Sequence, residues 1–219
     1  MRFFNTAGPV NCRRHYCLPP LHRFDLDEIS MLIAQEKYFV IHAPRQTGKT
    51  SYLLALMDYL NKEGQYKALY FNVEAAQAAR ENVKSAMHAI LSELAHRAKT
   101  FLNDTFLLDH MVEWKQHYDP NNLLNPVFSM WAEASDKPLV LFIDEIDTLI
   151  GDSLIAVLRQ LRAGYDKRPT AFPQSIILCG VRDVRDYCMH TDEGKPLVTG
   201  GSAFNIKAES LRLGNFSMF

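Results

Sequence analysis

The sequence has few cysteines, no long hydrophobic run and almost no net charge. Four cysteines in 219 residues are too few for a disulfide scaffold, so we expect reduced thiols and a reducing compartment. No run approaches the ~18 apolar residues of a membrane span, and the N-terminus lacks the apolar stretch of a secretory signal. The net charge of -1 gives no overall attraction to nucleic acid or an anionic membrane. We therefore expect a cytoplasmic protein without membrane association, and nucleic acid is not indicated as a partner.

Size and composition favour one compact domain. The chain is long enough for one substantial core, and 47% hydrophobic with 22% charged residues is ordinary for a soluble globular protein. We expect a single domain over residues 1–219, in which an N-terminal segment and helix (1–36) precede the core (37–219). No repeat, low-complexity tract or clear linker interrupts it.

Predicted strands and helices alternate along the core. Apolar runs predict strands at residues 38–41, 67–73, 139–143 and 175–179, with a further strand at 203–206. Helical spacing predicts helices at 25–36, after residue 50 with Gly64 as C-cap, at 83–94, near 126–134, and at 153–162, started by Asp152 or Ser153. The rest of 101–137 shows no clear pattern. This alternation implies βαβ units, and hence an α/β fold with a mostly parallel sheet and helices on both faces.

The loop between the first predicted strand and the next helix carries a phosphate-binding motif. Residues Ala43 to Thr50, A-P-R-Q-T-G-K-T, match G-x-x-x-x-G-K-[ST] with alanine in place of the first glycine. Backbone N–H groups in such a loop form an anion nest at a helix start, Lys49 reaches the β- and γ-phosphates, and the Thr50 hydroxyl ligates Mg²⁺. The expected nucleotide-binding residues are Ala43, Pro44, Arg45, Gln46, Thr47, Gly48, Lys49, Thr50 and Ser51.

Three details qualify this motif. Pro44 has no N–H, so the cradle must come from later residues, and Ala43 can serve if its φ is negative. Gly48 must stay small, because a side chain there would meet the phosphate. The alternative is an ordinary strand-to-helix turn that contains G-K-T by chance.

A second motif ends the third predicted strand with paired acids. Residues 139–147 read L-V-L-F-I-D-E-I-D, and ligands of open α/β sheets bind at such strand ends. Asp144 is the candidate for holding Mg²⁺ through a coordinated water, and Glu145 for polarising the water that attacks the γ-phosphate. The expected metal ligands are therefore Thr50 and Asp144, and the expected catalytic residues are Glu145, Lys49 and Arg182. The alternative is a solvated acidic strand end.

The order of the motifs along the chain predicts the order of the strands. A complete strand and helix separate the loop strand from the strand with the acids, as in P-loop ATPases whose sheet inserts another strand between those two. We expect the fourth strand to be the inserted one, with Arg182 or Asp183 at its end facing the γ-phosphate. Arg182 is our candidate γ-phosphate sensor, and the alternative is a surface arginine paired with Asp183 or Asp186. Asn72 is a further candidate, for holding Glu145 in an inactive position.

With these motifs, the sequence resembles the AAA-like and STAND-like P-loop ATPases, in particular bacterial ATP-binding proteins with A-P-R-Q-T-G-K-T, I-D-E-I-D and L-C-G-V-R-D-V-R. The phrases F-F-N-T-A-G-P-V and G-G-S-A-F-N-I-K-A-E-S-L extend the likeness to nearly the whole chain. The resemblance implies a three-layer P-loop NTPase fold, ATP or ADP with Mg²⁺, and an adenine pocket near His22, Arg23 and Phe24. Members usually continue into a helical lid, for which we find no segment before Phe219. We therefore expect an apolar surface that binds a protein partner or a second copy.

Several functions compete. The leading hypothesis is an Mg-dependent ATPase that acts as a switch or motor module, and the alternative is a nucleotide-dependent interaction module with little turnover on its own. A GTPase would need an N-K-x-D base reader, and the nearest string, N-K-E-G at Asn61, lies at a helix end. A small-molecule kinase would need an acceptor pocket and typically lacks the D-E pair.

Two other patterns are discounted. Cys12, His15, Cys17 and His22 lack the paired spacing of a zinc site. The aromatic cluster of Trp114, His117 and Tyr118, with Trp131 beyond it, is expected in the core or an interface rather than stacked on bases.

Overall fold

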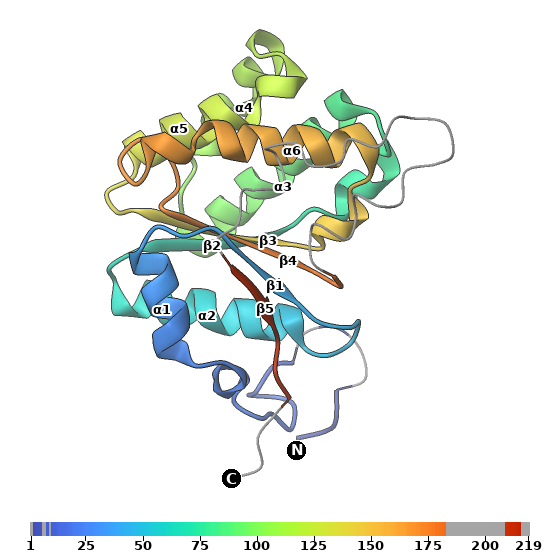
Figure 1. Ribbon diagram of the computed structural model, residues 1–219, viewed down its shortest axis with the longest axis vertical. Coiled ribbons are helices and arrows are strands. Elements are labelled where there is room, and N and C mark those ends of the chain that lie inside the picture. Colours follow the sequence, from blue (N-terminus) through green and yellow to red (C-terminus); the bar gives the residue numbers. More distant parts are fainter. Residues whose placement is uncertain (1, 6–7, 9, 183–208, 216–219) are drawn as a thin grey trace.

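A single parallel sheet organises the chain. The computed structural model describes residues 2–5, 8, 10–182 and 209–215, and its five strands are arranged in the order β2-β3-β4-β1-β5 (Figure 1). Every neighbouring pair is parallel, which confirms the predicted α/β fold class. The strands are β1 Phe39–His42, β2 Lys67–Asn72, β3 Leu139–Asp144, β4 Ser175–Gly180 and β5 Glu209–Arg212.

Helices cover both faces of this sheet and make it the middle of three layers. In Figure 1, α1 (Leu26–Ala34) and α2 (Lys49–Glu63) lie below the sheet. Above it lie α3 (Val83–Leu102), α4 (Phe106–His117), α5 (Leu124–Ala134) and α6 (Gly151–Ala163). Short 3₁₀ helices connect these elements: η1 Pro20–Arg23, η2 Glu74–Ala79, η3 Pro120–Asn122, η4 Ile146–Thr148 and η5 Tyr165–Lys167.

The alternation along β3 sets the direction of the acid at its end. Leu139, Leu141 and Ile143 pack in the core beneath α3 to α6, whereas Val140 and Phe142 pack in the core against α1 and α2. Because strand side chains alternate between faces, Asp144 follows Val140 and Phe142 toward α2. The apolar run that predicted this strand is fully buried, as expected for a strand covered on both faces.

The strand order predicted from the motifs is confirmed. β4 lies between β1, which leads into the phosphate loop, and β3, which ends in Asp144. The expected strand at 203–206 lies outside the described residues, and β5 begins at Glu209.

The structure confirms some of the predicted helix ends and contradicts another. Asp25 caps α1 by accepting the N–H of Asp27, and Gly64 ends α2 with a left-handed φ of 78°. The predicted cap of α6 is wrong, because its N-cap is Ile150 and no side chain caps it. Ser153 instead donates its hydroxyl to the carbonyl of Arg80 at 2.6 Å, a tertiary acceptor that a capping rule does not include.

Both tryptophans lie in the core, as predicted. Trp114 and Trp131 pack with the helices above the sheet, and Trp131 Nε1 donates to Asp104 Oδ2 at 3.0 Å. A buried indole with a satisfied N–H does not offer a stacking surface for bases. None of the helices in the described part of the chain is both long and apolar enough to cross a membrane.

Candidate functional site

The turn between β1 and α2 has the geometry of a phosphate loop. α2 begins at Lys49, and its N-cap Gly48 has φ 85° and ψ 23°, in the left-handed region. Gln46 is also left-handed, with φ 60°, whereas Ala43 does not have a positive φ and is buried at the end of β1. Alanine therefore fits where the motif usually has glycine. Glycine is needed at position 48, where an L residue would be strained.

Lys49 is folded back onto its own loop. Its Nζ donates to the carbonyls of Ala43 at 3.1 Å and Pro44 at 3.2 Å, and the residue is only 5% exposed. The Pro44 carbonyl also accepts the Thr47 hydroxyl at 2.8 Å. Pro44 thus contributes a carbonyl to the loop where it lacks an N–H, and the ammonium group is held where an anion in the loop would lie beside it.

The two sequence motifs meet through one hydrogen bond. Thr50 Oγ1 donates to Asp144 Oδ2 at 2.8 Å, although the two residues are 94 positions apart. Asp144 is 0% exposed, and its Oδ1 accepts the backbone N–H of Glu145 at 2.9 Å. The hydroxyl and the carboxylate predicted as metal ligands are therefore adjacent.

These oxygens fit Mg²⁺ better than an ion that needs a full protein cage. Mg²⁺ is bound through one or two protein oxygens together with phosphate oxygens and waters. The described residues contain no group of three or more His, Cys, Asp or Glu that could hold a metal by themselves. Thr50 and Asp144 would hold the ion, with phosphates completing its shell.

Glu145 stands at the turn that follows β3. Its backbone is left-handed, with φ 57°, and this sharp change of direction takes it away from the strand that carries Asp144. Burial raises the pKa of its carboxyl, and the negative charges of Asp144 and Asp147 raise this pKa further, against the opposing effect of Lys49. A carboxylate whose affinity for protons is increased in this way is suited to accept one from water.

A cleft of about 900 Å³ joins these groups. Its lining includes the loop and helix residues Arg45, Gln46, Gly48, Lys49, Thr50, Ser51 and Leu54, and beyond β3 the residues Tyr70, Asn72, Glu74, Gln77, Arg97, Glu145 and Thr148. Ligand sites are typically ~300–1,000 Å³. The cleft has the size of a ligand site, and it places Lys49, Thr50 and Glu145 on one surface.

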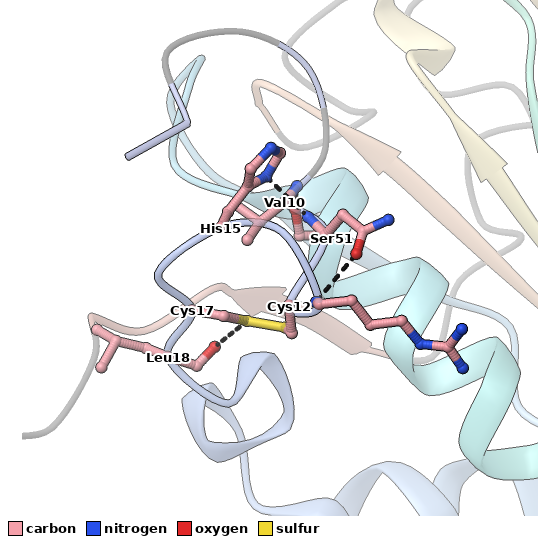
Figure 2. The surroundings of a disulfide bond; sticks show 8 residues. Val10, Cys12, His15, Cys17, Leu18 and Ser51 are labelled. Carbon is pink, nitrogen blue, oxygen red and sulfur yellow. Dashed lines mark hydrogen bonds between the residues drawn. A yellow bond between two sulfur atoms is a disulfide. The ribbon is translucent and has the colours of Figure 1, made fainter. Parts of the chain in front are cut away.

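The N-terminal segment forms another wall of the same cleft. Asn5, Gly8 and Val10 line it, and the Val10 N–H donates to Ser51 Oγ at 3.2 Å, in the first turn of α2 (Figure 2). The resemblance implied an adenine pocket near His22 to Phe24, but the described N-terminal residues that line the cleft are Asn5, Gly8 and Val10.

A disulfide bond closes a turn in that segment. Cys12 and Cys17 are joined, with their Cα atoms 5.1 Å apart (Figure 2). The expectation of reduced thiols is wrong for this pair. The N–H groups of Arg14 and His15 both donate to the Asn11 carbonyl, and this tight turn brings the two cysteines together. Cys179 is free and buried, and Cys188 lies outside the described residues.

Arg23 and Phe24 lie under the phosphate loop rather than in the cleft. Arg23 Nη1 donates to the carbonyl of Thr47, and its Nε donates to the carbonyl of Gly214 at 2.8 Å. Phe24 packs edge-on against Tyr52 of α2, with ring centroids 5.2 Å apart. Arg23 thus supports the loop, and Phe24 supports α2.

Of the remaining candidates, Arg182 does not line the cleft, and Asn72 lines it without a hydrogen bond to Glu145 in the described structure. Arg182 follows β4 by two residues, is exposed, and is not part of the cleft lining; Asp183 and Asp186 lie outside the described residues. Asn72 Oδ1 accepts the N–H of Glu74 at 2.6 Å, and no hydrogen bond joins Asn72 to Glu145 in the described structure. The suggested restraint of Glu145 by Asn72 is therefore absent here.

Two cleft residues were missed by the sequence reasoning. Tyr70 on β2 donates its hydroxyl to Asp144 Oδ2 at 3.0 Å, and Arg97 of α3 lies over the Tyr70 ring, with 5.7 Å between Cζ and the ring centroid. Strand alternation places Tyr70 on the α2 side of the sheet, but only the pairing of β2 with β3 shows that it reaches the acid.

Comparison with known proteins agrees with this fold. Residues 27–172 match the family described as "Nephrocystin 3, N-terminal". No curated protein sequence matches the chain. Similar solved structures include the Walker-type ATPase PABY2304 of Pyrococcus abyssi (TM-score 0.54, 17% identity, 89% of this chain and 54% of that one). Cdc6p from Pyrobaculum aerophilum has a TM-score of 0.53 at 18% identity, and the aligned region covers 86% of this chain and 44% of Cdc6p.

A third similar structure is Drosophila ORC bound to poly(dA/dT) DNA and Cdc6, with a TM-score of 0.52 at 9% identity. It covers 87% of this chain and 28% of that one. The chain therefore spans about half or less of the length of these three structures. At these identities the likeness concerns the fold, which is that of P-loop ATPases.

Proposed function

We propose, from the premise that this chain belongs to the nephrocystin 3 N-terminal family and has an AAA-like P-loop ATPase fold, that it binds ATP with Mg²⁺ and hydrolyses it. The observation that carries the proposal is the hydrogen bond between Thr50 and Asp144. It brings the end of the phosphate loop to the acid of a strand that is not its neighbour in the sheet. An ordinary turn that contains G-K-T by chance would not be expected to form this hydrogen bond with Asp144.

The phosphate loop has a defined task in this proposal. Backbone N–H groups between Arg45 and Thr50 bind the β- and γ-phosphates at the start of α2, where the helix end favours negative charge. Lys49 exchanges the carbonyls of Ala43 and Pro44 for phosphate oxygens, and this change releases two hydrogen bonds that now close the loop. Thr50 and Asp144 would hold Mg²⁺, which would supply positive charge to the transferring phosphoryl group.

Glu145 is the proposed base. It lines the cleft next to the acid that holds the metal, and its raised pKa makes it a stronger proton acceptor than an exposed glutamate. Its carboxylate orients a water toward the γ-phosphate and takes its proton as the water oxygen bonds to phosphorus, while the bond from the γ-phosphorus to the bridging oxygen breaks and ADP leaves with that oxygen. Arg182 stays a candidate sensor of the γ-phosphate, one that would have to move into the cleft.

The test combines binding and turnover. Titration with a fluorescent ATP analogue should show Mg-dependent binding that unlabelled ATP displaces, and Lys49→Ala should abolish it, since the ammonium group is lost. Glu145→Gln should keep binding and stop phosphate release. Lys62→Ala, in the last turn of α2, is the matched control and should preserve both. Wild-type affinity in Lys49→Ala would refute the site, and wild-type hydrolysis in Glu145→Gln would refute its base.

A second candidate is a nucleotide-dependent interaction module with little turnover. The exposed position of Arg182 outside the cleft lining favours it, because conformational closure would then be needed to complete the site. Single-turnover measurements separate the two: a switch or motor module releases phosphate within one binding event, whereas an interaction module retains intact ATP until a protein partner or second copy binds.

A further inference from the structure

A buried hydroxyl on the strand beyond the acids contacts the proposed metal ligand. We infer that Tyr70 is a positioning residue, one that fixes the orientation of the Asp144 carboxylate and thereby sets the affinity of the site for Mg²⁺. This inference rests on the proposed function and deepens it.

The pairing of β2 with β3 places the two side chains within reach of each other. The strands are parallel, with Tyr70 opposite Phe142 and Asn72 opposite Asp144. Strand alternation puts Tyr70, Phe142 and Asp144 on the same face, toward α2. The Tyr70 ring therefore spans from its own position to a residue two steps further along the neighbouring strand, where its hydroxyl donates to Oδ2 at 3.0 Å.

The groups that donate hydrogen bonds to the Asp144 carboxylate differ in their other roles. Oδ2 accepts the hydroxyls of both Thr50 and Tyr70, at 2.8 and 3.0 Å, and Oδ1 accepts the N–H of Glu145 at 2.9 Å. Thr50 has a ligand role of its own in the proposed site, so its hydroxyl must also serve the ion. Tyr70 has no such second role, so its hydroxyl serves only to hold Oδ2.

Tyr70 is itself held firmly. It is 3% exposed, its backbone N–H donates to Met57 Sδ at 3.3 Å, and the guanidinium of Arg97 covers its ring. Arg97 is in turn fixed by Glu93, with Nε 2.6 Å from Oε1.

A hydrogen-bond donor that orients a metal ligand affects metal affinity by a known amount. Loss of such outer partners weakens metal binding by ~10–100-fold. Tyr70→Phe removes the hydroxyl and leaves the packed ring. We therefore expect the Mg²⁺ concentration for half-maximal enhancement of ATP binding to rise by that factor, while ATP affinity in EDTA stays within about twofold, since the phosphate loop is untouched.

The matched control is Tyr52→Phe. Tyr52 is 0% exposed in the same core, but its hydroxyl has no hydrogen-bond partner among the described residues, so its removal should leave the Mg²⁺ midpoint unchanged. Thermal unfolding of both variants, followed by circular dichroism, shows that each is folded. A second measurement uses Asp144→Asn: in that background Tyr70→Phe should have little further effect on the midpoint, since the acceptor has changed.

The outcomes separate the inference from the proposed function. A wild-type chain without Mg-dependent ATP binding overturns the proposed function and the inference with it. A wild-type chain with such binding, and a Tyr70→Phe variant with the same Mg²⁺ midpoint, overturns the inference alone. A shift of equal size in Tyr52→Phe also overturns it, because the effect would then come from packing.

Discussion

Gly48→Ala is the substitution that tests the geometry of the phosphate loop most directly. Gly48 has φ 85°, and a left-handed conformation costs an L residue ~1–2 kcal/mol. An added Cβ would lie 3.2 Å from Arg23 Nη1, and that guanidinium is held by the carbonyls of Thr47 and Gly214. Weakening one of these hydrogen bonds costs about 1 kcal/mol more. The expected loss of unfolding free energy is about 2–3 kcal/mol, from the sum of these two costs.

Gly64→Ala is the matched control. Gly64 has φ 78°, but the nearest atom to an added Cβ is Lys137 Nζ at 3.9 Å, so only the backbone cost of ~1–2 kcal/mol applies. Urea denaturation followed by circular dichroism gives the unfolding free energy of both variants, and titration with a fluorescent ATP analogue gives their affinities. Gly48→Ala should lose roughly tenfold in affinity, because strain at the N-cap would displace the loop N–H groups that bind the phosphates, and Gly64→Ala should lose none.

Equal values for Gly48→Ala and Gly64→Ala, in unfolding free energy or in ATP affinity, would contradict this prediction. Equal destabilisation would mean that the guanidinium of Arg23 does not restrict the loop. Unchanged ATP affinity in Gly48→Ala would mean that the N-cap of α2 does not face the phosphates.

Two further predictions concern other parts of the chain. Burial, and then the charges of Lys115 and Lys84, lower the pKa of His88, so the folded state binds a proton less readily than the unfolded state does. Unfolding free energy should therefore fall as the pH drops below the ordinary histidine value of 6.5, and His88→Gln should flatten this dependence in urea titrations; equal slopes would contradict it. Deleting residues 2–17 removes the Val10 contact with Ser51 and a wall of the cleft, so ATP affinity should fall several-fold, with a change in unfolding free energy of about 1 kcal/mol or less. An affinity equal to that of the full chain would show that the segment does not face the nucleotide.

The two motifs predicted the fold well because each of them must lie at the carboxyl end of a buried strand. A phosphate loop needs a strand before it and a helix after it, and paired acids need the carboxyl end of a buried strand. The separation of the two motifs along the chain then predicted that β4 lies between β1 and β3. The contact between Thr50 and Asp144 follows from that arrangement.

Features that depend on tertiary neighbours were not predicted. α4 was missed because it packs on other helices and buries only Leu107 and Trp114, too narrow a stripe to read as a helix period. The hydrogen bond of Tyr70 depends on the register of two strands, and the partner of Ser153 is a distant carbonyl. The wall formed by Asn5, Gly8 and Val10 depends on how the N-terminal segment lies against the start of α2, which no local pattern encodes.

The two hydrogen bonds of Arg23 have a mechanical consequence. One guanidinium joins the Thr47 carbonyl in the phosphate loop to the Gly214 carbonyl just after β5, the strand at one edge of the sheet (Figure 1). Any rearrangement that lifts Thr47 as phosphates enter must therefore either break this link or pull the polypeptide that follows β5. If the proposed nucleotide site is correct, a shift of Thr47 would in this way be transmitted through a single side chain to Gly214 and the adjoining end of β5.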